Sequence, residues 1–155
     1  MTHMPDTVRD FLAARRIAVA GVSRDANQPA NLIYRRLRDT GHQVVAVNPA
    51  ATEVEGDPCW PDLASVPDAV DAVVVATPPA VAPAVVRAAA DRGVPLVWMH
   101  RSFGEGSVSP EAVALCRERG IRVIVGGCPM MYCGRVDPVH RCMRWILDLG
   151  GRIEA

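Results

Sequence analysis

The feature of this sequence that most limits its fold is a regular alternation of short apolar runs with longer helical segments. Four of these runs are rich in valine, and the fifth is interrupted by Arg122: Ile17–Ala20, Val44–Val47, Ala72–Ala76, Val94–Met99 and Ile121–Val125. Apolar runs of this length are typical of strands that are covered on both faces. We therefore predict five strands, the last of them half exposed.

The segments between the runs have the pattern of helices. Three of them end directly before a glycine, which is a common signal at the carboxyl end of a helix. In the third, Ser109 stands as the N-cap and Pro110 as the first helical residue. Two further helices are expected, one before the first strand and one at the end. The predicted helices are Asp6–Arg15, Asn31–Thr40, Ala80–Arg92, Pro110–Arg119 and Val139–Leu149.

Strands that alternate with helices indicate βαβ units with a parallel sheet and right-handed crossovers. We predict one α/β domain over residues 1–155, with a doubly wound sheet of about five strands and helices on both faces. The segment Pro49–Pro67 holds four prolines. It is expected to be a connection with little regular structure and a short edge strand near Cys59–Trp60.

Composition excludes several classes of protein. Half of the 155 residues are hydrophobic, and 17 basic residues balance 17 acidic ones, which argues against disorder and against a nucleic-acid or membrane surface. No apolar run approaches the ~20 residues that cross a bilayer, and Met1–Arg16 lacks a signal-peptide core. We expect a cytoplasmic protein whose five cysteines are free thiols.

The first strand is followed by Gly21, Val22, Ser23 and Arg24. A glycine at this place lets the backbone of a doubly wound fold approach a phosphate. Ser23, Arg24 and the amides beyond them could hold a diphosphate. The full dinucleotide fingerprint has three glycines and this loop has one, so a tight turn without a ligand is the alternative.

The second strand ends at Asn48 and Pro49, and no acidic residue follows before Glu53. Dinucleotide sites use an acidic side chain here to bind the free ribose hydroxyls. An uncharged tip favours a ribose that already carries a phosphate, as in coenzyme A (CoA) or NADP, with Arg24 as the partner of that phosphate. This argues against NAD.

The third strand ends at Thr77, Pro78 and Pro79. Two prolines make a stiff, apolar turn at the carboxyl edge of the sheet, where ligands of such folds bind. The turn could equally be a rigid connection to the next helix.

Taken together, these strand ends resemble those of the small CoA-binding protein family, which is similar to the CoA-binding domain of the succinyl-CoA synthetase alpha subunit and of ADP-forming acyl-CoA synthetases. The resemblance extends roughly from Ala13 to Leu149. The matching motifs are Ala20–Ser23, Val47–Pro49, Thr77–Pro79, Val97–His100, Gly56 with Cys59–Leu63, and Cys128–Met130.

The resemblance implies a Rossmann-type fold with CoA or acyl-CoA across the carboxyl edge of the sheet. By position, the loop after the first strand would contact the phosphates, Asn48 and Pro49 the adenosine, and Thr77–Pro79 the diphosphate and pantetheine. Met99 and His100 would stand near the pantetheine. The sequence departs from the family at His100, where glutamine is more usual, and in a longer Arg101–Ser109 segment.

The resemblance does not imply a reaction. The synthetases use a phosphorylated histidine from a second domain and a partner subunit, and 155 residues leave room for neither. We therefore expect a non-catalytic binding or sensor module. Two alternatives stay open: an acyl-CoA-dependent enzyme that uses His100 or Cys128, and an NADP-binding redox protein.

The remaining residues of interest lie towards the end of the chain. The spacing of Cys128, Cys133, His140 and Cys142 does not match a common zinc pattern, so no metal site is expected. Cys128 could form a mixed disulfide with the CoA thiol, or simply be a small packed residue. The three tryptophans are interpreted as packing residues, and a homodimer through the last helix is possible; the residues concerned are Trp60, Trp98, Trp145, Ile146 and Leu149.

Overall fold

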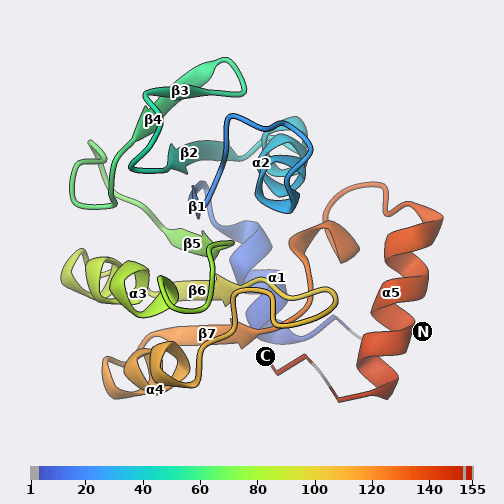
Figure 1. Cartoon of the computed structure of the whole chain (residues 1–155). Coiled ribbons are helices and arrows are strands. Elements are labelled where there is room, and N and C mark those ends of the chain that lie inside the picture. The colour runs from blue at the N-terminus through green and yellow to red at the C-terminus, as the bar shows by residue number, and fades with distance from the viewer. Residues whose placement is uncertain (1–3, 152, 155) are drawn as a thin grey trace.

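The computed structural model describes residues 4–151 and 153–154. Its centre is a seven-stranded sheet in the order β3-β4-β2-β1-β5-β6-β7 (Figure 1), in which only the β3–β4 pair is antiparallel. The chain moves outward from β1 in both directions, which confirms the doubly wound α/β fold. The strands are β1 (Arg16–Ala20), β2 (Gln43–Val47), β3 (Glu53–Val54), β4 (Asp57–Trp60), β5 (Ala72–Val75), β6 (Leu96–Met99) and β7 (Arg122–Val125).

Helices cover both faces of the sheet. Successive strand residues point to opposite faces, so Ile17 and Val19 enter one core cluster and Ala18 and Ala20 the other. The first cluster is covered by α1 (Asp6–Ala13), α2 (Pro29–Asp39), a 3₁₀ turn (Pro129–Met131) and α5 (Pro138–Leu149), and the second by α3 (Ala82–Asp91) and α4 (Pro110–Glu118).

The sheet has seven strands rather than the predicted five or so. The difference lies in the proline-containing segment after β2, which forms the β3–β4 hairpin and adds β4 to β2 through the parallel pairs Ala46–Cys59 and Val47–Trp60. Glu55 and Gly56 make the hairpin turn with positive φ values of 54° and 79°. The short strand expected near Cys59–Trp60 is present as β4, although β3 and not β4 lies at the edge of the sheet; β3 has only two residues and was not predicted.

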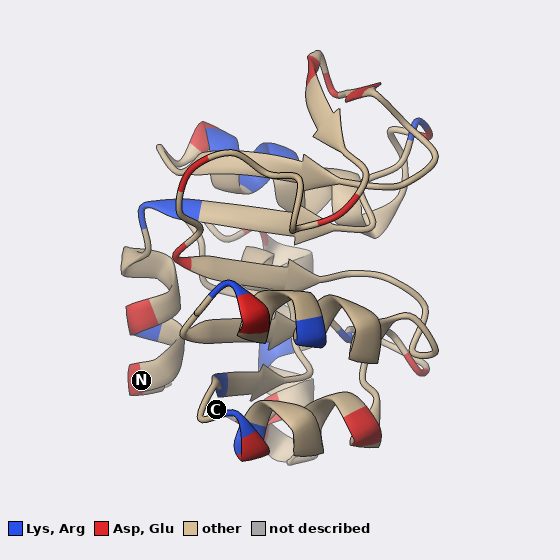
Figure 2. Ribbon diagram, turned by 90° about the vertical axis from the view of Figure 1, so that its left-hand side faces the viewer, with Lys and Arg blue, Asp and Glu red and all other residues tan. Residues whose placement is uncertain are grey.

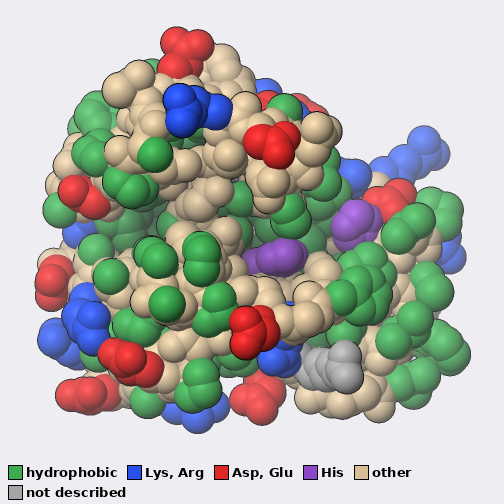
Figure 3. Space-filling view, viewed as in Figure 1, with side chains coloured by type: hydrophobic (Ala, Val, Ile, Leu, Met, Phe, Trp, Pro, Cys, Tyr) green, Lys and Arg blue, Asp and Glu red, His purple; other side chains and the backbone are tan. Residues whose placement is uncertain are grey.

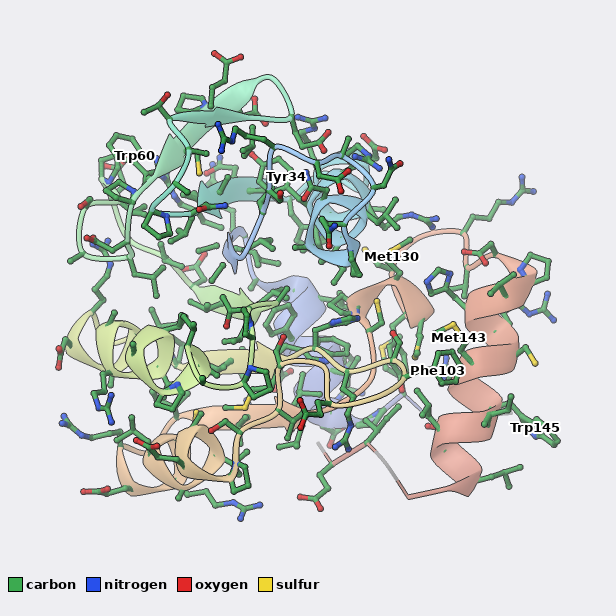
Figure 4. All side chains as sticks on the ribbon, in the orientation of Figure 1. Tyr34, Trp60, Phe103, Met130, Met143 and Trp145 are labelled. Carbon is green, nitrogen blue, oxygen red and sulfur yellow. The ribbon has the colours of Figure 1, made fainter. Side chains whose placement is uncertain are left out.

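The tryptophans do not all pack as expected. Trp98 is fully buried and donates its indole N–H to the carbonyl of Gly126 at 2.9 Å, which confirms its packing role. The prediction is wrong for Trp145, which is 61% exposed. Figure 4 shows Met143 on the side of α5 that faces the body of the protein and Trp145 on the side that faces away. Leu147 is the buried anchor of this helix.

The arrangement of the strands gives the sheet one functional edge. Figure 2 shows the arrowheads of the parallel strands gathered at the same edge, with the connecting loops beyond them. Loops at this edge are free to vary without disturbing the core, so ligand sites of open α/β sheets form there. In the described part of the chain, no helix has the length and apolar character needed to cross a membrane.

Candidate functional site: a cleft at the carboxyl edge

A cleft of about 560 Å³ lies at this edge, between the ends of β1, β2 and β5 on one side and α3 on the other. Figure 3 shows the surface hollowed between the upper part of the molecule and the region of α3, with hydrophobic side chains within the hollow. The cleft brings together residues of all three predicted strand ends. Its lining includes Gly21, Ser23, Asn48, Pro49, Thr77 and Pro78.

Gly21 makes the close approach of two strand ends possible. Its φ is +105°, a backbone conformation that residues other than glycine rarely adopt. A Cβ atom at this position would overlap the backbone carbonyl of Ala76. Its amide donates to the carbonyl of Val47 at 3.0 Å. Because residue 21 is a glycine, the ends of β1, β2 and β5 can pack closely together at the base of the cleft.

The loop after Gly21 is held by a residue that the sequence analysis did not identify. The buried side chain of Asn31 accepts from the Ser23 amide at 2.8 Å and donates to the Ser23 carbonyl at 2.7 Å. Its amide also donates to Glu55 at 2.7 Å, and Glu55 pairs with Arg35 at 2.7 Å. The signal in the sequence was an Asn at the start of a predicted helix, because Asn side chains at that place often bond to neighbouring backbone groups.

Asn48 shapes the cleft as well as lining it. Its side-chain amide donates to the carbonyl of Val22 at 2.8 Å, and its oxygen accepts from the amide of Ala50 at 2.8 Å. These two bonds fix the loop after β1 against the turn after β2. Much of the hydrogen-bonding capacity of this side chain is therefore used within the protein.

One wall of the cleft was not predicted at all. It is apolar and comes from α3 and from the loop after β4. The signal for it was the alanine-rich Ala80–Arg92 segment, because small side chains leave space beside a helix. The additional lining residues are Val81, Ala84, Val85, Ala88, Pro61, Asp62 and Leu63.

The charges around the cleft are unevenly placed. No acidic residue stands at the end of β2, as expected, but Asp62 reaches the cleft from the loop after β4. Hydrogen bonds from the hydroxyl and the amide of Ser65, both 2.8 Å to Oδ1, lower the pKa of Asp62. Arg24 is exposed and lines a neighbouring hollow of about 430 Å³ that shares Pro49 and Pro61 with the cleft.

The other expected contact residues lie outside the cleft lining. Val22 and Met99 are fully buried in the core, and Pro79 is half-buried. His100 is also buried, with its Nε2 atom 3.2 Å from the hydroxyl of Ser102. Burial, and to a lesser extent the charge of His140, lowers the pKa of His100 to about 4.

Cys128 is 3% exposed, and burial raises its pKa to about 11. Both properties oppose a reactive thiolate at neutral pH. Nearby, Cys133 is buried with its Sγ atom 3.0 Å from the hydroxyl of Thr40, whereas Cys142 is exposed. Among the described residues, no group of three His, Cys, Asp or Glu side chains is arranged to hold a metal ion.

The fold and this cleft define a Rossmann-type α/β domain of the class that binds ligands at the carboxyl edge of its sheet. Residues 15–134 match the model of a family described as a CoA binding domain. The chain therefore belongs to this CoA-binding domain family, as its strand-end motifs indicated.

Individual relatives agree with this assignment. The chain is similar to acetate–CoA ligase [ADP-forming] II of Archaeoglobus fulgidus, with 29% identity over 77% of this chain but only 19% of the ligase. It is similar to the uncharacterized protein YneT of Bacillus subtilis, with 26% identity over 74% of this chain and 82% of YneT. The solved structure of a hypothetical protein from Pyrococcus horikoshii matches 84% of this chain and 94% of its own at 26% identity, with a TM-score of 0.74.

Proposed function

We propose that this protein is a cytoplasmic, non-catalytic module that binds CoA or acyl-CoA in the cleft at the carboxyl edge. The observation that carries the proposal is the meeting of three strand ends, at Gly21, Asn48 and Thr77, in one cleft of about 560 Å³. Membership of the CoA-binding domain family supports the same ligand.

The shape and polarity of the cleft suggest how CoA would lie. The diphosphate would rest on the turn from Gly21 to Ser23, near the amino end of α2, where helix amides and the helix dipole favour anions. The adenosine would lie against Pro49 and the apolar wall. Arg24 would face the 3′-phosphate from the adjoining hollow.

The pantetheine would run along the sheet edge past Thr77, Pro78 and Pro79 towards the end of β6. Val22 and Met99 would support the site from the core beneath it. His100 would lie at the far end of this path, but it is buried and bound to Ser102, so its role would be to pack and not to transfer protons.

Burial of both candidate catalytic groups favours binding over catalysis. A general base must reach the proton it removes, whereas His100 is buried, and a nucleophilic thiol needs a lowered pKa, whereas that of Cys128 is raised. The separate hollow is lined by Arg24 and by the acidic Glu53, and Arg24 would face a third phosphate there, which CoA and NADP carry and NAD lacks.

Isothermal titration under reducing conditions with CoA, dephospho-CoA, NADPH and NAD tests the proposal. We expect micromolar or tighter binding of CoA, weaker binding of dephospho-CoA and no binding of the nicotinamide cofactors. Ala84→Glu places a bulky anion on the exposed cleft side of α3 and should weaken CoA binding at least tenfold.

Ala114→Glu is the matched control, because Ala114 is an exposed alanine on α4, which does not line the cleft. It should leave the affinity unchanged. Equal effects of the two substitutions would place the ligand elsewhere. Tight binding of NADPH without binding of CoA would reject the proposed ligand.

A further inference from the structure

The charge distribution in the cleft is unexpected for a site that receives a polyanion. Of the described residues that line it, Asp62 alone carries a charge, and the charge is negative. The carboxylate is held in place by the amide and the hydroxyl of Ser65 at its Oδ1 atom. A carboxylate has about four acceptor sites, so these bonds leave capacity to accept from a ligand.

Asp62 and the predicted diphosphate position are supplied by different elements of the cleft. Ser23 and Gln28 line it at the amino end of α2, whereas Asp62 comes from the loop after β4. Figure 1 shows that loop on the same side of the sheet as α3, whereas α2 lies on the opposite side. Electrostatic repulsion from the carboxylate and attraction to the helix end would therefore orient a phosphate-bearing ligand in one direction.

The cleft that Asp62 lines has apolar surface of the kind that binds the faces of a heteroaromatic ring. Leu63, Val85 and Ala88 contribute apolar surface to the same cleft. A site of this kind binds a base through its faces and identifies it by a few polar groups at its edge. The polar group offered here is an ionised carboxylate, which only accepts hydrogen bonds.

We propose that Asp62 determines the base specificity of the site by accepting a hydrogen bond from the 6-amino group of adenine. Guanine and hypoxanthine carry a carbonyl oxygen at this position, which repels a carboxylate that faces the 6-substituent; their N1–H is a donor, so the discrimination requires that Asp62 meets the 6-position and not N1. The inference rests on the proposed function, since it assumes that the nucleotide end of CoA lies in the cleft. With this contact, the protein would select adenine nucleotides over nucleotides with other bases.

The test compares adenosine 3′,5′-bisphosphate with inosine 3′,5′-bisphosphate, which differ at the 6-position and its neighbouring N1 proton. Titration of the wild-type protein should show about a tenfold preference for the adenosine compound, because a charged acceptor gains a hydrogen bond from the 6-amino group and is repelled by a 6-carbonyl oxygen. Asp62→Asn keeps an acceptor for Ser65 and adds an amide that can donate to a carbonyl. It should bring the preference to within about twofold, mainly by tighter binding of the inosine compound.

Asp91→Asn is the matched control, because it removes an exposed carboxylate at the end of α3 outside the cleft lining. It should keep the wild-type preference. Thermal melting of both variants verifies that each is folded. An unchanged preference in Asp62→Asn would overturn the inference.

A gain in affinity of Asp62→Asn for CoA that is absent for dephospho-CoA would also overturn it, because the carboxylate would then face the phosphorylated ribose. Failure of the proposed function gives a different result. In that case the wild-type protein would bind neither CoA nor adenosine 3′,5′-bisphosphate, whereas failure of the base inference alone leaves CoA binding intact.

Discussion

The two halves of the carboxyl edge differ in what lies above the strand ends. Above β1, β2 and β5 the edge is open, and its strand ends line a cleft of about 560 Å³. Above β6 and β7 the corresponding positions, His100 and Cys128, are buried. Both halves carry polar or reactive side chains after valine-rich strands, yet only one half exposes them to a ligand.

The closed half is covered by the loop 101–109 and the segment after β7. The amide of Arg101 donates to the carbonyl of Gly127 at 2.9 Å, and the amide of Ser107 donates to the carbonyl of His100 at 2.7 Å. Gly106 fits against this turn so closely that a Cβ atom would lie 2.6 Å from the His100 carbonyl. The loop 101–109 thus folds back over the end of β6.

The difference between the two halves shows that position at the carboxyl edge and access to a ligand are separate properties, which a sequence does not distinguish. A residue that follows a parallel strand is placed at the functional edge by topology, but access to it depends on the loops that cover that edge. At the open half, the close approach at Gly21 and the side-chain hydrogen bonds of Asn31 and Asn48 shape the cleft. At the closed half, the same kind of position contributes to stability.

The substitution expected to have the largest effect on stability and on CoA affinity is Gly21→Ala, at the open half. The added Cβ meets the carbonyl of Ala76, and the positive φ adds backbone strain. Together these should lower the free energy of unfolding by about 4 kcal/mol. The folded fraction should bind CoA at least tenfold more weakly, because the three strand ends can no longer approach. Chemical denaturation and titration measure the two effects.

Gly41→Ala is the control for backbone strain alone. Gly41 also has a positive φ, of 95°, but no atom lies within 4 Å of an added Cβ. Gly41→Ala should lower the free energy of unfolding by about 1 kcal/mol and leave the CoA affinity unchanged. Similar losses of stability and affinity in both variants would mean that the close approach at Gly21 is unimportant for the cleft.

The next effect belongs to the closed half and depends on pH. The pKa of His100 is about 4 in the folded protein, and the ordinary value is 6.5. The unfolded state therefore binds a proton more readily, so stability falls as the pH drops from about 6.5 to 4. The contribution is about 3 kcal/mol. His100→Gln, which keeps a polar partner for Ser102, should lack this part of the loss.

Urea unfolding of both proteins at pH 7 and pH 4 measures this difference, and comparison of the two proteins cancels the carboxylates that also titrate. Titration with CoA at pH 7 should give affinities within about twofold, since His100 does not line the cleft. If the free energy of unfolding fell equally with pH in the wild type and in His100→Gln, His100 would not be buried as a neutral group. A tenfold loss of CoA affinity would show that the closed half takes part in binding.

Much of the fold could be predicted because its signals are local. Valine-rich runs and the glycines after the helices predicted the five adjacent parallel strands β2, β1, β5, β6 and β7. Ser109 does cap α4 by accepting from the amide of Ala112 at 3.3 Å. The short strand near Cys59–Trp60 was expected and is present as β4, but β3 and the pairing of β4 with β2 could not be predicted, because they depend on contacts such as that between Ala46 and Cys59 that no local pattern encodes.

The candidate site was predictable only in part, for a related reason. Topology places Gly21, Asn48 and Thr77 at one edge, and the structure brings them into one cleft. The sequence does not show that Asn31 holds the first loop or that Asp62 enters the cleft from the next strand along the edge. Both depend on where separate elements meet in space.

The smallest expected effect concerns Arg24, at the outer margin of the open half. This side chain is exposed and shares its hollow with Pro49. A solvent-exposed ion pair contributes at most about 1 kcal/mol, so Arg24→Gln should weaken CoA binding about threefold and leave the binding of dephospho-CoA unchanged. Arg119→Gln, an exposed arginine at the end of α4, is the matched control. Equal losses of affinity for CoA and dephospho-CoA would mean that Arg24 contacts the diphosphate and not the 3′-phosphate. No loss of affinity for either ligand would mean that Arg24 does not contact the ligand.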